Sequence, residues 1–186
     1  MADPANPAIA RVIEVAARKG VALDIRSFDA PTGTAAEAAA AVDAEVGQIA
    51  RTVVFVAPRP EGRLAAIVCL VSGANEVDPK LLAAVLGERS VRAATSREAR
   101  DLTGFGGSIM PPLGYPRATR VVMDQDLCPY QWVWAVAGVD GAAFRVTPGI
   151  LRMLANAVVA PIAASPWVVA TLVPQVGRAL EAGSGA

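Results

Sequence analysis

The sequence predicts a mixed α/β domain with a largely antiparallel sheet that is wrapped by helices. Two β-branched runs, 49–56 and 64–71, are separated by turn-forming residues at 58–62, which predicts an antiparallel hairpin at the centre of the sheet. Helical patterns alternate with further strand-like runs on both sides, so other strands must be joined by crossovers. The 186 residues fit one domain, and a hydrophobic content of 54% is enough for a single core.

Each element before the hairpin has its own start and stop signals. Asn6 and Pro7 provide an N-cap and a first helical residue, and apolar residues then recur at helical spacing until Gly20. Residues 21–28 are predicted to form a strand, and 34–46 an alanine-rich helix.

The elements after the hairpin follow from proline caps, β-branched runs and polar residues before helical patterns. They are a helix over 79–86, a strand over 91–94, a helix from its cap Ser96 to about Thr103, a strand over 119–123, a short helix over 127–134, a strand over 143–146, and a helix from Thr147 to about 157.

The chain divides into a domain over 1–158 and an apolar extension over 159–186. Residues 157–176 carry no charge, but three prolines interrupt them, so we expect packing rather than membrane insertion. Two alternatives stay open for the extension, which either docks on its own domain or forms a homodimer interface.

Composition excludes several classes of protein. The chain has no histidine, which rules out Ser-His-Asp and Cys-His catalysis and the commonest zinc sites. Cys69 and Cys128 lack the spacing of a metal site or redox pair, and no dinucleotide or phosphate-loop motif occurs. Asp124 and Asp126 are interpreted as a helix cap rather than metal ligands. We expect no metal and no cofactor, and the start of the chain lacks a secretory pattern, which favours the cytoplasm.

Charge is balanced overall but uneven along the chain. The 17 basic and 17 acidic residues cancel, which argues against binding nucleic acid through bulk charge alone. Residues 88–120 nevertheless carry six arginines against three carboxylates. This run is either a solvated helix face or a patch for a polyanion.

The arginines surround an unusual loop over 103–115, which contains four glycines and two prolines. Glycine lets a ligand approach the backbone closely, whereas proline stiffens the chain. The loop is either a rigid connection between strands or a binding loop whose amides hold an oxygen-rich ligand.

Several segments, in this order, resemble the YbaK/ProX family of aminoacyl-tRNA deacylases over about residues 5–158. These segments are VGQIARTVVF at 46–55, VSGANEVDPKLL at 71–82, ATSREA at 94–99 with LTGF at 102–105, PPLG at 111–114, and FRVTP at 144–148. The resemblance implies the editing-domain fold and hydrolysis of the ester that joins a wrong amino acid to the 3′ end of a tRNA. It also implies that a water, aided by the ribose hydroxyl of the substrate, attacks a carbonyl held by the loop.

The resemblance also assigns site residues. The catalytic positions are Arg51, Gly107 and Ser108, and the substrate-binding positions are Phe28, Thr52, Pro111, Pro112, Gly114, Gly138 and Thr147.

Two departures from the family fall at this site. Arg51 replaces the usual lysine, and arginine is larger, planar and never deprotonated. Ser108 aligns with a family glycine, although a shift by one residue would use Gly107 instead, and the neighbouring Ile109 and Met110 add bulk. Two hypotheses therefore remain: a trans-editing hydrolase, or a catalytically inactive module that binds a tRNA end, a nucleotide-like ligand or a protein partner.

Overall fold

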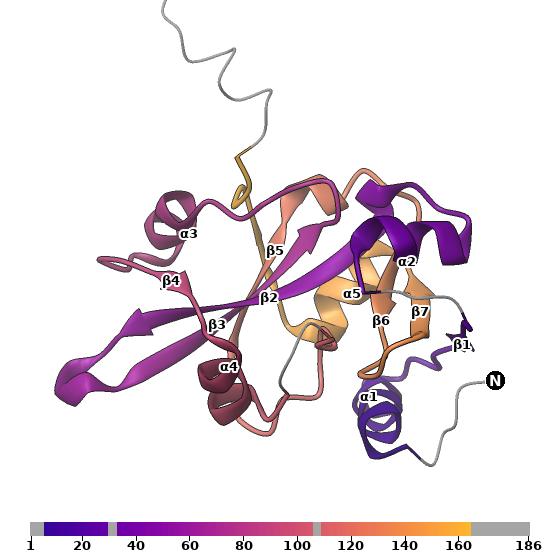
Figure 1. Ribbon diagram of the computed structural model, residues 1–186, viewed down its shortest axis with the longest axis horizontal. Helices are drawn as coiled ribbons and strands as arrows, with labels where there is room; N and C mark the ends of the chain where they lie inside the picture. The colour runs from indigo at the N-terminus through magenta and orange to yellow at the C-terminus, as the bar shows by residue number, and fades with distance from the viewer. Residues whose placement is uncertain (1–5, 30–32, 106–108, 165–186) are drawn as a thin grey trace, which may run out of the picture.

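A computed structural model describes residues 6–29, 33–105 and 109–164. Its described strands form one eight-stranded sheet in the order β1-β7-β6-β2-β3-β5-β8, with β4 pairing beside β2 (Figure 1). Four of the seven strand pairs are antiparallel and three are parallel, which confirms the predicted fold class. The strands are β1 (Ile25–Ser27), β2 (Ile49–Pro58), β3 (Leu64–Ser72), β4 (Arg92–Ala93), β5 (Arg120–Asp124), β6 (Val133–Val136), β7 (Ala142–Val146) and β8 (Val158–Ala160).

The predicted hairpin lies at the centre of the sheet, because β2 and β3 pair over nine residues on each strand. Side chains on both of its faces are buried, including Val68 on one face and Phe55 with Ile67 on the other. Burial on both faces explains why the sequence here reads as continuous β-branched runs rather than as alternation.

Five helices lie within the described parts of the chain, and the caps of four of them follow the predicted chemistry. The helices are α1 (Pro7–Arg18), α2 (Ala35–Val42), α3 (Pro79–Leu86), α4 (Ser96–Thr103) and α5 (Pro148–Ala155). One cap was predicted one residue too late. The Thr95 hydroxyl, not Ser96, accepts a hydrogen bond from the Glu98 amide, and the Glu98 carboxylate accepts one from the Thr95 amide, which completes a capping box.

Three other predictions on secondary structure need correction. The expected helix over 127–134 is wrong, because only Gln125–Leu127 form a short 3-10 turn and 133–136 form strand β6. Val133 and Trp134 are buried, so the pairing of β6 with β2 outweighs the local helical pattern. The first strand is shorter than predicted, and the helix predicted over 34–46 ends at Val42. Strand β8 was not predicted at all.

The chain stays attached to the sheet beyond residue 158. Strand β8 pairs with β5 in parallel, Ile162 is fully buried, and Ala163 forms a bridge with Val77. Residues 165–186 lie outside the described residues, so the predicted role of the extension remains a prediction. Within the described ranges, no helix is both long enough and apolar enough to cross a membrane.

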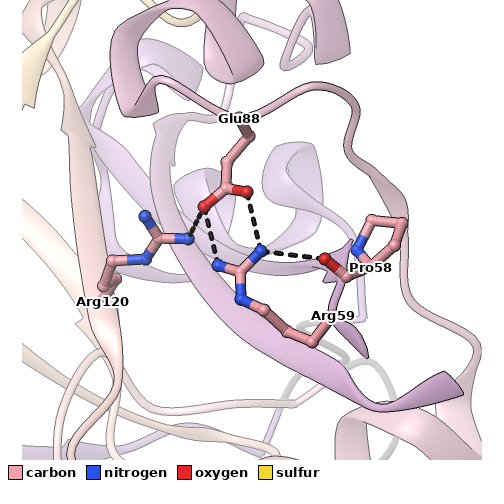
Figure 2. A network of polar contacts seen from close by, with 4 residues as sticks. All are labelled: Pro58, Arg59, Glu88 and Arg120. Carbon is pink, nitrogen blue, oxygen red and sulfur yellow. Dashed lines mark hydrogen bonds and ion pairs between the residues drawn. The ribbon is translucent and has the colours of Figure 1, made fainter. Parts of the chain in front are cut away.

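A polar network joins the far end of the hairpin to the rest of the sheet (Figure 2). The carboxylate of Glu88, between α3 and β4, accepts two hydrogen bonds from Arg59 at 2.7 and 2.8 Å and another from Arg120 at the start of β5. Arg59 also donates to the carbonyl of Pro58 at 2.9 Å. These hydrogen bonds hold the pKa of Glu88 at about 2, well below its ordinary value. The network therefore fixes three segments that are distant in sequence.

Candidate active site

The sheet is open along one stretch of β2. Strand β6 pairs with β2 only at Ile49 and Ala50, and β4 pairs with it only at Phe55 and Val56. Between these contacts, residues 51–54 face a cavity of about 620 Å³, a volume typical of ligand pockets. Residues from α2, β2, α4, β6, β7 and the glycine–proline loop line it.

The open stretch presents the backbone N–H and C=O of one residue to the cavity. The carbonyl of Ile49 accepts a hydrogen bond from Gly73 on the β3 side, whereas the carbonyl of Val54 accepts one from Ala94 on the opposite side. In an antiparallel pair, the N–H and C=O of one residue point to the same edge, and successive residues alternate between edges. The N–H and C=O of Thr52 therefore point into the gap between β6 and β4.

The cavity reaches both faces of the sheet around this open edge. Arg51 and Thr52 are neighbours in a strand, so their side chains project from opposite faces. On the Arg51 face the wall is aromatic, because Phe28 packs edge-on against Trp134 with ring centroids 6.3 Å apart. On the Thr52 face the wall is small and apolar and includes Met110 from the loop.

Arg51 is held at the mouth of the aromatic side. Its Nη2 donates to the carbonyl oxygen of Asn75 at 2.5 Å and to Oε1 of Glu76 at 2.8 Å. Its Nε is buried and has no hydrogen-bond partner among the described groups, and the same holds for the hydroxyl of Thr52. Two consecutive residues of the open strand thus each bury a polar atom that has no hydrogen-bond partner. Leaving such atoms unpaired lowers the stability of the fold unless another interaction offsets the loss.

Asn75 is itself fixed by two carboxylates at the end of β5. Its Nδ2 donates to Asp124 at 2.9 Å and to Asp126 at 2.8 Å. Asp124 is almost fully buried, and this desolvation raises its pKa although the Asn75 hydrogen bond opposes the rise. Asp124 also accepts a hydrogen bond from the Asp126 amide, so Asp124 caps the 3-10 turn Gln125–Leu127 in place of the helix that was predicted there. Within the described ranges, no group of carboxylates and cysteines is arranged to hold a metal ion.

The structure brings three of the predicted site residues together. Phe28, Arg51 and Thr52 all line the cavity, and Ile109 and Met110 bring the glycine–proline loop to it. The predicted catalytic positions Gly107 and Ser108 lie outside the described residues, so their role stays a prediction.

The other predicted positions lie in the surrounding structure, not in the lining. Pro111 and Pro112 are buried, and the Pro111 carbonyl accepts a hydrogen bond from Tyr115 at 2.6 Å. Gly114 and Gly138 adopt φ of +93° and +95°, which favours glycine at both positions. Thr147 caps α5 by accepting a hydrogen bond from the Ile150 amide.

Sequence reasoning did not assign Asn75, Glu76 or Trp134 to the site. Glu76 and Trp134 line the cavity, and Asn75 positions Arg51. Asn75 and Glu76 lie in the segment 71–82, which carries part of the family resemblance. That resemblance was the signal in the sequence that could have assigned these two residues to the site. Trp134 gave no such signal, because an apolar run is equally consistent with burial in the core.

Comparison with known proteins agrees with this geometry. Residues 29–154 match the aminoacyl-tRNA editing domain family. The crystal structure of a protein proposed to be a trans-editing enzyme for prolyl-tRNA synthetase is 38% identical with a TM-score of 0.76, and the match covers 86% of this chain and 99% of that one.

Two further solved structures have the same fold. One comes from a study of epitope backbone grafting onto scaffold proteins, with 34% identity, a TM-score of 0.75, and coverage of 86% of this chain and 99% of that one. The other is a hypothetical protein with 25% identity, a TM-score of 0.73, and coverage of 82% and 99%. No curated protein matches this chain.

This chain belongs to the aminoacyl-tRNA editing domain family, since the family match spans more than half of its length. The resemblance to the YbaK/ProX deacylases is thereby confirmed.

Proposed function

We propose that this protein is a trans-editing hydrolase that removes a wrong amino acid from the 3′ end of a tRNA. The observation that carries the proposal is the cavity at the open edge of β2, which Arg51 and the glycine–proline loop both line in a chain of the editing family. Its volume of about 620 Å³ suits an aminoacyl-adenosine.

The two sides of the cavity suit the two parts of this substrate. On the aromatic side, the rings of Phe28 and Trp134 provide surfaces against which the terminal adenine stacks. The small apolar side near Met110 suits a short amino-acid side chain. The ester then lies at the open edge, beside Arg51 and the backbone of Thr52.

In the reaction, a water oxygen bonds to the ester carbonyl carbon, and the bond between that carbon and the ribose oxygen breaks. The water loses a proton with the help of the neighbouring ribose hydroxyl, and the ribose oxygen takes up a proton as it leaves. Arg51 orients the terminal ribose or phosphate, and backbone amides at Gly107 and Ser108 hold the carbonyl oxygen as it gains charge. One such donor contributes about 2.7–4 kcal/mol in comparable sites. No step needs a histidine, which the chain lacks.

The test is release of amino acid from a panel of tRNAs mischarged with small amino acids. We expect one or more members to be deacylated, and we expect Arg51→Ala to lower that rate. Arg18→Ala is a matched control, because this exposed arginine forms only a 3.8 Å pair with Glu14 on α1. A protein that binds tRNA but releases no amino acid from any member would contradict the proposal.

The second candidate is an inactive module of the same family that binds a tRNA end, a nucleotide-like ligand or a protein partner. The observation that favours it is that Arg51, which replaces the family lysine, is already engaged by Glu76 and the Asn75 carbonyl. The double variant Arg51→Lys with Ser108→Gly separates the two candidates. A gain of deacylation in this variant, from an inert natural protein, would identify a lapsed hydrolase.

A further inference from the structure

We propose that Glu76 is a substrate-binding residue that receives the protonated α-amino group of the aminoacyl ester. The inference rests on the proposed function and deepens it, because it assigns one chemical group of the substrate to one side chain. It also extends to an inactive binding module, since binding the amine requires no catalysis.

The first observation is the position of the carboxylate. Glu76 lines the cavity, yet 87% of its side chain is exposed, so a ligand can reach it directly. Its single described hydrogen bond comes from Nη2 of Arg51 at 2.8 Å and uses Oε1. A carboxylate has about four acceptor sites on two oxygens, so Glu76 keeps capacity for another donor.

The second observation concerns charge. An aminoacyl ester carries one cation near the reacting carbonyl, the α-ammonium group, whose ordinary pKa is about 7.7–8.0. Apart from Glu76, the described cavity wall has one other carboxylate, that of Asp140. The remaining wall is mostly apolar, and its other acceptors, such as the carbonyl and hydroxyl of Thr52, are neutral, so these two carboxylates are the wall's negatively charged partners for a cation.

The third observation is the match of dimensions. In an α-amino ester, the nitrogen and the carbonyl carbon are both bonded to the α-carbon, so the two groups lie about one hydrogen-bond length apart. Arg51 and Glu76 are separated by a similar length, 2.8 Å between Nη2 and Oε1. Because the Glu76 carboxylate is in contact with the Arg51 guanidinium, a substrate whose ester lies against Arg51 has its ammonium group within reach of Glu76.

The experiment uses two stable ligands that differ only at the α-nitrogen. One is adenosine with alanine joined to the 3′ position by an amide in place of the ester, and the other is the same compound with the α-amino group acetylated. Calorimetry at about pH 6.5 measures both affinities, because the free amine is then mostly protonated.

We expect the wild-type protein to bind the free amine about tenfold more tightly than the acetylated compound, which corresponds to about 1.4 kcal/mol. Glu76→Gln keeps the size of the side chain and removes its charge, so the preference should fall close to one. Asp140→Asn is the matched control at the other carboxylate and should keep the preference. Because the readout is a ratio within each variant, changes that affect the binding of both compounds equally cancel.

Three results would overturn the inference: equal binding of both compounds by the wild type, a preference that survives in Glu76→Gln, or binding of neither compound. A preference that disappears in Asp140→Asn alone would assign the amine to Asp140 and overturn it as well. These outcomes differ from failure of the proposed hydrolysis, because a protein that prefers the amine but releases no amino acid would retain this inference and lose the hydrolase assignment.

Discussion

At the scale of single residues, the site depends on how Arg51 is held. Its guanidinium is directed by a backbone carbonyl of Asn75, and the side chain of Asn75 is in turn held by two carboxylates. The position of the cation is therefore set by residues in the turn after β3 and at the end of β5.

We predict that Asn75→Ala lowers the rate of deacylation, or the affinity for a ligand, about tenfold. The reason is that Arg51 would be less well positioned, and a tenfold change corresponds to a loss of about 1.4 kcal/mol of binding free energy. The same change should have little effect when Arg51→Ala is already present. A double-mutant cycle on the rate or the dissociation constant measures this coupling. Additive effects of the two changes would show that Asn75 has only a structural role.

Gly73 provides a second test at this scale, because it lies in the cavity wall where β3 ends. A Cβ atom there would overlap the carbonyl oxygen of Val46 and lie 2.9 Å from Cβ of Ala35. We predict that Gly73→Ala destabilises the fold by about 1–3 kcal/mol through overpacking.

Gly149→Ala is the matched control. This exposed glycine lies in α5 and has nothing within 4 Å of its expected Cβ, so the change should be neutral or stabilising by up to about 1 kcal/mol. Urea unfolding of both variants gives the comparison, and equal stabilities would contradict the packing argument.

At the scale of elements, the Glu88 network connects the tip of the hairpin with β5 and the start of β4. The pKa of Glu88 is about 2 in the fold, against an ordinary 4.5. A carboxyl group whose pKa is lowered by folding stabilises the fold fully above its unfolded pKa, and this contribution is lost as the pH falls toward the folded pKa.

We therefore predict that Glu88→Gln lowers the free energy of unfolding by about 1–3 kcal/mol at pH 7, a range typical of hydrogen bonds to charged groups. The difference from the wild type should stay constant down to about pH 5 and shrink from there toward pH 3. Glu14→Gln, which removes an exposed pair on α1, should change stability by less than about 0.5 kcal/mol. A Glu88→Gln effect that does not depend on pH would show that packing, not charge, connects these elements.

At the scale of the whole molecule, three of the six arginines of the 88–120 stretch lie in ion pairs between described residues. Arg92 pairs with Glu98, Arg97 with Asp101, and Arg120 with Glu88. Under the proposed function, this pairing leaves fewer free cations, so we expect the cavity and a few local cations to contribute more to tRNA recognition than a broad basic surface.

The apolar segment over 165–186 gives the prediction at this scale. We propose that it mediates a homodimer, so removal of the chain after Ala164 should convert a dimer into a monomer in size-exclusion chromatography. Truncation there keeps β8 and the buried Ile162, which are parts of the sheet. A full-length chain that already elutes as a monomer would remove the dimer proposal.

The sequence by itself determined the hairpin, the five helices and the family. These features depend on local signals, such as a turn between β-branched runs or a polar cap before an apolar pattern, and on segments such as 46–55 that identify relatives. The sequence also pointed to Arg51 and Thr52, because they lie within one of those segments.

Only the tertiary structure decided where the sheet opens and what holds Arg51. The gap exists because β6 and β4, which are 40 residues apart in sequence, each pair with a different short stretch of β2. Likewise, Asn75 meets Asp124 and Asp126 only because β5 lies beside β3 in parallel. Such contacts follow from the register of distant strands, and no local pattern encodes that register, since it minimises the free energy of the whole packed sheet.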